Sequence, residues 1–183
     1  SSTSRGLGDV YKRQIFIVSD NGEIWCFKQQ NWIKIESLVS EDLNDIVFEG
    51  ERGLISGSSG LILGSENNGE TWEIRETPEE VSNSNIISIG FYGMNRGHAI
   101  TSDGQILKST QEALTTTVGY YWYLKEIESE NMSTTLGINL TSIEVLSTTK
   151  ILLSGENGYI ALSKDGGNIC LLYTSDAADE EDS

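Results

Sequence analysis

The chain has 183 residues and a formal net charge of −16, with 28 acidic and 12 basic side chains. An acidic surface disfavours nonspecific binding to nucleic acid and to anionic membranes, because both need positive charge. No apolar run approaches the ~18 residues that a membrane helix requires. The composition therefore predicts no nucleic-acid partner and no membrane insertion by this segment.

The two ends of the chain differ from the rest. Residues 1–14 (SSTSRGLGDVYKRQ) and 170–183 (CLLYTSDAADEEDS) resemble the translated sequencing-adapter read-through that flanks metagenomic gene fragments. We interpret both ends as non-native and exclude them from fold prediction. The remaining segment, 15–169, has nine basic and 22 acidic residues, a net charge of −13. We expect this segment to be truncated on both sides.

The first repeat unit, at about 15–36, is incomplete. An N-G pair ends at Gly22, and a short apolar strand (EIWCF) and Trp32 follow. The strand that opens the later units has no counterpart here. We expect the unit to lack its opening strand.

The second unit, at about 43–76, reads as four short strands. Alternating apolar and β-branched residues place them at roughly 45–49, 53–58, 61–65 and 71–75. An S-G pair ending at Gly60 supplies the positive φ that a tight hairpin needs between the second and third strands.

The third unit (about 86–127) and the fourth (about 140–169) keep the same frame. Gly104 and Gly158 follow Asp and Asn and precede short apolar strands, as Gly60 does after Ser. An L/I-x-x-I-x-hydrophobic strand lies upstream in each of units two to four. We expect the fourth unit to lack its closing strand.

Units of about forty residues with four antiparallel strands are typical of β-propeller blades. The sequence therefore predicts an all-β fold, an incomplete β-propeller of about four blades. Two of these blades should be whole and two truncated.

One loop motif recurs at the end of the third strand. Residues 65–72 (SENNGETW) resemble the Asp-box, S-x-D-x-G-x-T-W, of the BNR repeat families, with Asn67 at the aspartate position. A second copy at 163–167 keeps the aspartate. Such side chains close a tight turn, and the resemblance implies a structural, non-catalytic role. The expected Asp-box residues are Ser65, Asn67, Gly69, Thr71, Trp72, Ser163, Asp165 and Gly167.

The longer pattern from Leu43 to Trp72 is similar to the photosystem II assembly/stability-factor-like subset of BNR propellers. This resemblance implies a non-enzymatic scaffold that docks other proteins and uses no cofactor. It favours an extracytoplasmic location, although the residues themselves leave the compartment open.

The enzymatic alternative is a fragment of a secreted sialidase-like glycoside hydrolase, or a carbohydrate-binding propeller. Resemblance to the hydrolases would imply three arginines that clamp a substrate carboxylate. The native segment has only Arg52, Arg75 and Arg96, which we place at turns or strand ends. The aromatic run 120–123 reads as an outer strand and His98 as a strand residue. We therefore predict no catalytic residue, and ligand spacing predicts no metal site.

Three basic residues share one repeat position. Arg52, Arg96 and Lys150 each lie eight residues before a repeat glycine. Equivalent positions on successive blades lie side by side around a propeller. We hypothesise that they form a basic arc for a protein partner rich in carboxylates.

Overall fold

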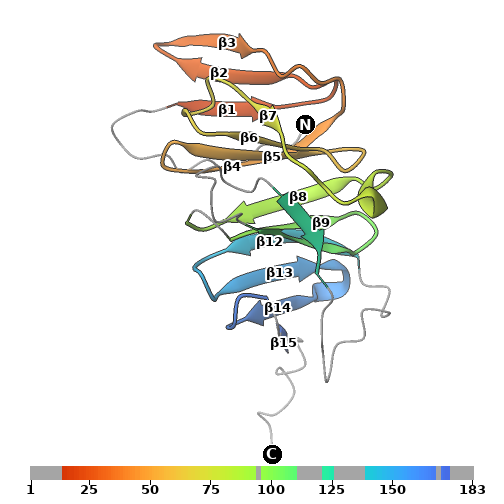
Figure 1. Ribbon diagram of the computed structural model, residues 1–183. Helices are drawn as coiled ribbons and strands as arrows, with labels where there is room; N and C mark the ends of the chain where they lie inside the picture. The colour runs from red at the N-terminus through yellow and green to blue at the C-terminus, as the bar shows by residue number, and fades with distance from the viewer. Residues whose placement is uncertain (1–13, 94–95, 111–120, 126–138, 168–169, 174–183) are drawn as a thin grey trace, which may run out of the picture.

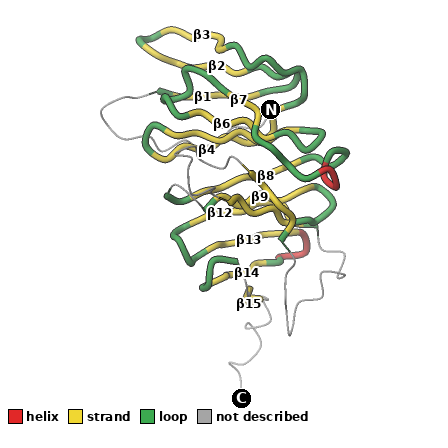
Figure 2. Tube along the Cα trace, in the orientation of Figure 1, coloured by secondary structure: helices red, strands yellow, loops and turns green. Residues whose placement is uncertain are grey.

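The structure is a computed structural model that describes residues 14–93, 96–110, 121–125, 139–167 and 170–173. Their strands form four antiparallel sheets in which neighbouring strands are consecutive in the chain. The sheets stack on one another in chain order (Figure 1). Over these residues, helix is limited to two short 3-10 turns, η1 (Glu79–Val81) and η2 (Glu156–Gly158) (Figure 2). The predicted all-β architecture is confirmed.

The four sheets are formed by successive segments of the chain. The first has three described strands, β1 (Ile15–Val18), β2 (Ile24–Lys28) and β3 (Asn31–Ile35). The second comprises β4 (Leu43–Glu49), β5 (Arg52–Gly57), β6 (Ile62–Ser65) and β7 (Glu73–Ile74). The third comprises β8 (Ile86–Phe91), β9 (Gly97–Thr101), β10 (Ile106–Thr110) and β11 (Tyr121–Leu124). The fourth comprises β12 (Leu140–Val145), β13 (Ile151–Gly155), β14 (Ile160–Ser163) and β15 (Cys170–Tyr173).

The fourth sheet corrects one expectation. We expected its closing strand to be missing, yet β15 pairs antiparallel with β14, and Cys170 lies opposite Ser163. The physical reason is the open edge of β14, whose backbone N–H and C=O groups need partners. An adjacent run of β-forming residues supplies them. These residues belong to the end that we interpret as non-native; the rest of that end, and residues 1–13, lie outside the described residues.

The repeat glycines occupy the expected hairpins. Each lies in the turn between the second and third strands of its unit with positive φ, from +69° to +85°, a conformation that favours glycine. In the first sheet the corresponding turn joins β1 to β2. This correspondence identifies β1 as a second strand, and the described residues of that sheet include no innermost strand.

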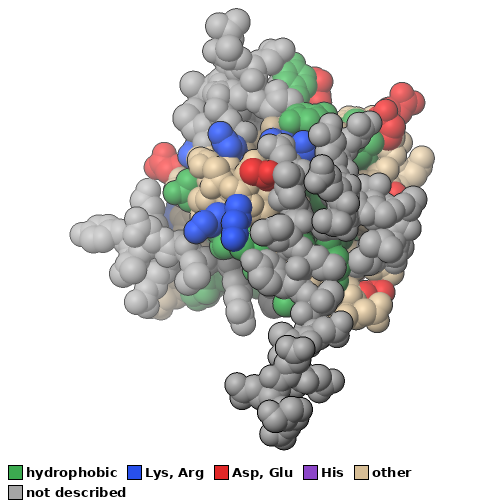
Figure 3. Space-filling model, turned by 90° about the horizontal axis from the view of Figure 1, so that it is seen from below, with side chains coloured by type: hydrophobic (Ala, Val, Ile, Leu, Met, Phe, Trp, Pro, Cys, Tyr) green, Lys and Arg blue, Asp and Glu red, His purple; other side chains and the backbone are tan. Residues whose placement is uncertain are grey.

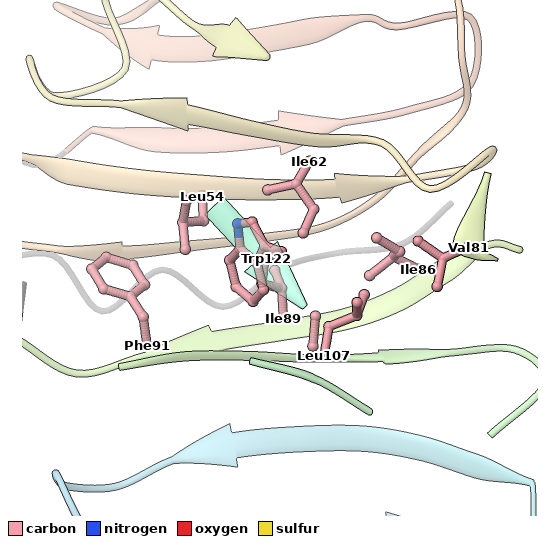
Figure 4. Close-up of a cluster of buried hydrophobic side chains, with 9 residues drawn as sticks. Leu54, Ile62, Val81, Ile86, Ile89, Phe91, Leu107 and Trp122 are labelled. Atoms are coloured by element: carbon pink, nitrogen blue, oxygen red, sulfur yellow. The ribbon is translucent and has the colours of Figure 1, made fainter. Parts of the chain in front are cut away.

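The core lies between the sheets. Leu54 and Ile62 of the second sheet point towards Phe91 and Trp122 of the third (Figure 4). These four side chains are at most 5 % exposed, and two further clusters of this kind join the other neighbouring sheets. Burying one such side chain contributes about 1.5–3 kcal/mol. The order of the sheets therefore depends on contacts between them.

Candidate docking surface

The turns that join the first and second strands of the last three sheets lie on one side of the molecule, on the left in Figure 1. They connect β4 to β5, β8 to β9 and β12 to β13. We call this side, with the Asp-box loops beside it, the hairpin face. Arg52, Arg96 and Lys150 all lie at the end of these turns, so the structure gives them equivalent places.

Neighbouring hairpins contact one another directly. The Glu49 carboxylate accepts a hydrogen bond from the backbone N–H of Gly93 at 2.6 Å. The Arg96 guanidinium donates to the carbonyl oxygen of Thr148 at 2.6 Å. The three turns therefore form a continuous strip across the second, third and fourth sheets.

The three basic residues differ in their surroundings. The Arg52 guanidinium lies 3.8 Å from the Glu49 carboxylate, and its side chain is 24 % exposed. Arg96 and Lys150 are exposed. Much of the charge of Arg52 is therefore balanced within its own hairpin, whereas Arg96 and Lys150 present theirs to solvent.

The Asp-box loops bind to the same hairpins. In the second sheet the Ser65 hydroxyl accepts a hydrogen bond from the Gly69 N–H at 2.9 Å, and the Asn67 side-chain oxygen accepts one from the Thr71 N–H at 3.0 Å. The Asn68 N–H then donates to the carbonyl of Glu51 in the β4–β5 turn at 2.6 Å. These bonds hold both the loop and the turn that precedes Arg52.

The fourth sheet repeats this arrangement. Ser163 accepts from the Gly167 N–H and donates to the Asp165 carboxylate, both at 2.8 Å. The Gly166 N–H donates to the carbonyl of Thr149, next to Lys150, at 2.8 Å. Thr149 and Glu51 hold the same repeat position, so each loop fixes the turn beside a basic residue.

Two further lysines lie near Arg96. The Lys108 ammonium is 3.4 Å from the carbonyl oxygen of Gly166. Burial lowers the pKa of Lys108, and the positive charges of Lys125 and Arg96 lower it further, while Asp165 opposes them. Sequence reasoning missed both lysines because neither belongs to the repeated frame. A charged residue within a short apolar strand was the available signal for Lys108.

His98 lies beneath this basic group. It is 2 % exposed, and neither ring nitrogen makes a hydrogen bond of good geometry. Burial and then the charge of Lys108 lower its pKa to about 4, although the nearby Gly166 carbonyl favours the protonated ring. The ring nitrogen is close to Gly167, on which a Cβ would lie 3.2 Å from it. His98 is therefore a neutral packing residue between the third and fourth sheets at pH 7.

The arginines do not converge on a common site. Arg52 pairs with Glu49 and Arg96 bonds to Thr148, as described above. The Arg75 side chain is fully buried between the carboxylates of Glu66 and Glu73, at 3.3 and 3.2 Å. Each guanidinium is therefore bound in a different place, and the described residues assemble no three-arginine carboxylate clamp.

The other features that the sequence raised are the aromatic run, a metal site and a membrane helix. Tyr121–Leu124 forms the outer strand β11, as predicted. Among the residues placed by the structure, no three His, Cys, Asp or Glu side chains gather as metal ligands would. Over the same residues, no helix has the length and hydrophobicity to cross a membrane.

The stacked antiparallel sheets of three or four described strands and the Asp-box loops define a β-propeller of the BNR class. Residues 5–110, more than half of the chain, match the family model described as "Photosynthesis system II assembly factor YCF48". The chain therefore belongs to this family. A search of curated proteins found no match.

Solved structures show the same fold. YCF48 from Cyanidioschyzon merolae is 24 % identical with a TM-score of 0.59, over 72 % of this chain and 39 % of that one. A structure titled YCF48 bound to D1 peptide is 17 % identical with a TM-score of 0.59, and the match covers 90 % of this chain and 44 % of that one. The GH74 xyloglucanase from Xanthomonas campestris is 14 % identical with a TM-score of 0.62, and the match covers 90 % of this chain and 29 % of that one. The chain thus spans less than half the length of each of these proteins.

Proposed function

We propose that the chain is part of a non-catalytic propeller scaffold that docks a protein partner through the hairpin face. Membership of an assembly-factor family supports a role in protein binding. A related propeller has been solved with a bound peptide. The partner surface would be rich in carboxylates, because the contacting residues of this chain would be Arg96 and Lys150, with Arg52 at the edge.

One observation carries this proposal. The exposed cations on the hairpin face are held on turns that bond to one another and to the Asp-box loops. A docking site built on such fixed turns loses little conformational entropy when it binds. Figure 3 views the molecule from the fourth sheet. Several Lys and Arg side chains (blue) lie near one another on the left, the side of the turns in Figure 1, while most visible acidic side chains lie at the edges.

The charge of the chain supports a specific site over general attraction. With an overall charge of −16, the protein repels acidic molecules except where cations cluster. Complementary charge raises the association rate and fixes the orientation of the partner, and added salt weakens both effects. Binding through the hairpin face should therefore be sensitive to salt.

The test uses an array of synthetic peptides graded in their content of Asp and Glu. The wild-type chain should bind more strongly as this content rises. The single variants Arg96→Glu and Lys150→Glu should each weaken the trend, whereas the matched control Lys34→Glu should keep it. All three variants change the net charge equally, and Lys34 lies on β3 of the first sheet. Equal loss in the control and in the two hairpin-face variants, or binding independent of acidity, would contradict the proposal.

Arg96 and Arg52 differ in their local partners, a carbonyl oxygen for Arg96 and a carboxylate for Arg52, and this difference gives a further check. Arg52→Glu would place a carboxylate beside Glu49, which already accepts the Gly93 N–H. We expect its effect on binding to be smaller than that of Arg96→Glu, because Arg52 is partly neutralised by Glu49.

A glycoside hydrolase function remains the alternative; hydrolysis of xyloglucan by the purified chain would favour it over the scaffold.

A further inference from the structure

One position on the hairpin face differs in chemistry between the sheets. It lies where the innermost strand enters the turn, opposite the basic residue of the same turn. The opposing pairs are Glu49 and Arg52 in the second sheet, Tyr92 and Arg96 in the third, and Leu146 and Lys150 in the fourth. The position is therefore acidic in the second sheet and aromatic or apolar in the other two.

In the second sheet this residue binds groups of the molecule itself. The Glu49 carboxylate lies 3.8 Å from the Arg52 guanidinium and also accepts the Gly93 N–H of the next turn at 2.6 Å. Its charge is balanced within the molecule, and it offers no apolar surface to a partner. The contact between the second and third turns is therefore complete in itself.

The third sheet leaves both members of its pair available. Tyr92 is 42 % exposed, and Arg96 is exposed as well. The Arg96 guanidinium donates to the Thr148 carbonyl of the fourth turn, which is a neutral group. Across the described part of the chain, no ion pair involves Arg96. The exposed ring and the unbalanced charge therefore persist with the neighbouring turn in place.

A tyrosine beside an arginine suits one kind of partner. A Tyr ring offers a large apolar surface at a low cost in conformational entropy, and Tyr and Arg are enriched among the residues that dominate binding energy in protein interfaces. The Arg fork binds a carboxylate through two parallel hydrogen bonds. A segment with an apolar side chain next to a carboxylate can therefore contact both residues at once.

From this arrangement we infer that the seam between the third and fourth turns, formed by Tyr92 and Arg96, binds a partner segment in which an apolar side chain adjoins an Asp or Glu. The inference rests on the proposed docking function and assigns its centre and the chemistry of its partner. Leu146 and Lys150 repeat the pair on the next turn, so a longer segment with the same alternation would extend towards them. Nucleic acid, whose bases also stack on aromatic rings, is disfavoured by the net charge of −16.

Four synthetic peptides of equal length test the inference by fluorescence anisotropy. They combine Glu or Gln at one position with Leu or Ser at the next. The wild-type chain should bind the Glu–Leu peptide most tightly. Changing Leu to Ser, or Glu to Gln, should each weaken binding by about tenfold, because each change removes one of the two contacts.

Variants assign each preference to one residue. Tyr92→Ser should remove the preference for Leu and keep the preference for Glu, whereas Arg96→Gln should remove the preference for Glu. Tyr123→Ser is the matched control, because Tyr123 is 40 % exposed on the outer strand β11. This control should keep both preferences. Circular dichroism of each variant checks that its sheets are intact.

The outcomes separate this inference from the proposed function. A wild-type chain with no preference for Glu contradicts the proposed function, and the inference with it. A preference for Glu without one for Leu, or a Tyr92→Ser variant that still prefers Leu, overturns the inference alone. Displacement of the Glu–Leu peptide by single-stranded DNA would assign the seam to nucleic acid and also overturn the inference.

Discussion

The carboxylate of Asp45 on β4 accepts a hydrogen bond from the Ser88 hydroxyl on β8 at 3.1 Å, across the boundary between the second and third sheets. The same hydroxyl accepts the backbone N–H of Ile143, on the fourth sheet, at 3.2 Å. Asp45 also accepts the N–H of Ile89 at 3.0 Å. One serine therefore connects the innermost strands of three successive sheets.

Replacing this serine tests how much the connection contributes. Ser88→Ala removes a donor to a largely buried carboxylate and an acceptor for a buried N–H, so we expect the free energy of unfolding to fall by about 1–3 kcal/mol. Urea denaturation measures the change. Ser142→Ala is the matched control, because Ser142 holds the same position on β12 but is exposed. Its effect should lie within about 0.5 kcal/mol; equal losses in both variants would show that Ser88 does not act through these bonds.

The Asp-box of the second sheet predicts which side chains position 67 tolerates. Asn67 accepts from the Thr71 N–H and donates to the Thr71 hydroxyl at 2.9 Å. Asn67→Asp keeps the acceptor, and the Thr71 hydroxyl can turn to donate, so stability should change little. Asn67→Ala removes these two bonds and the one that Asn67 Oδ1 accepts from the Ser65 hydroxyl at 3.0 Å, and it should destabilise the protein by about 1–2 kcal/mol. Thermal unfolding of the three proteins would contradict this interpretation if the Asp and Ala variants lost equal stability.

Trp122 fills the place in the third sheet that Trp72 fills in the second. A Cβ on Gly97 would lie 2.6 Å from the Trp122 ring, and one on Gly53 would lie 2.8 Å from the Trp72 ring. Trp122→Ala should cost about 3–5 kcal/mol, the range for a large buried aromatic side chain. Trp32→Ala, at the same position of the first sheet but 46 % exposed, should cost clearly less. Chemical denaturation at low protein concentration compares the two, and similar losses would mean that burial against the glycine is not the cause.

The sequence was sufficient for the fold because the repeat glycines and the apolar strands recur in a fixed order. It did not predict that Trp122 in the third sheet holds the position that Trp72 holds in the second. An insertion separates Ser109 from Trp122, and only the strand pairing that places these two residues opposite each other shows the equivalence. We also did not predict strand β15, because the repeat motif ends before this segment. The segment pairs with β14, whose edge is otherwise open.

The candidate site was predicted only in outline. The repeat register identified Arg52, Arg96 and Lys150, but register carries no information about local partners. Glu49 lies opposite Arg52 in the hairpin and balances part of its charge. Lys108 reaches the Asp-box of the next sheet, 58 residues further along the chain. Contacts between sheets of this kind depend on packing in three dimensions, which no pattern within a single unit shows.

His98 should make stability depend on pH. The pKa of His98 in the folded protein is about 4, against an ordinary value of 6.5. The largest cause of this decrease is burial, which disfavours the charged ring. The unfolded chain therefore binds more protons between these values. Stability from this residue is fully present above pH 6.5 and falls as the pH drops towards 4, by roughly 3 kcal/mol in total.

His98→Leu isolates this effect, because leucine occupies the equivalent positions 54 and 152. The difference in free energy of unfolding between the wild type and the variant should change across pH 4–6.5 and be constant above it. Using the difference matters because burial raises the pKa of Asp45, which favours the folded state as the pH falls and would mask the histidine. His98 is the single histidine, so its ring proton resonance reports the folded pKa directly. A midpoint near 6.5 in the folded protein would contradict the prediction.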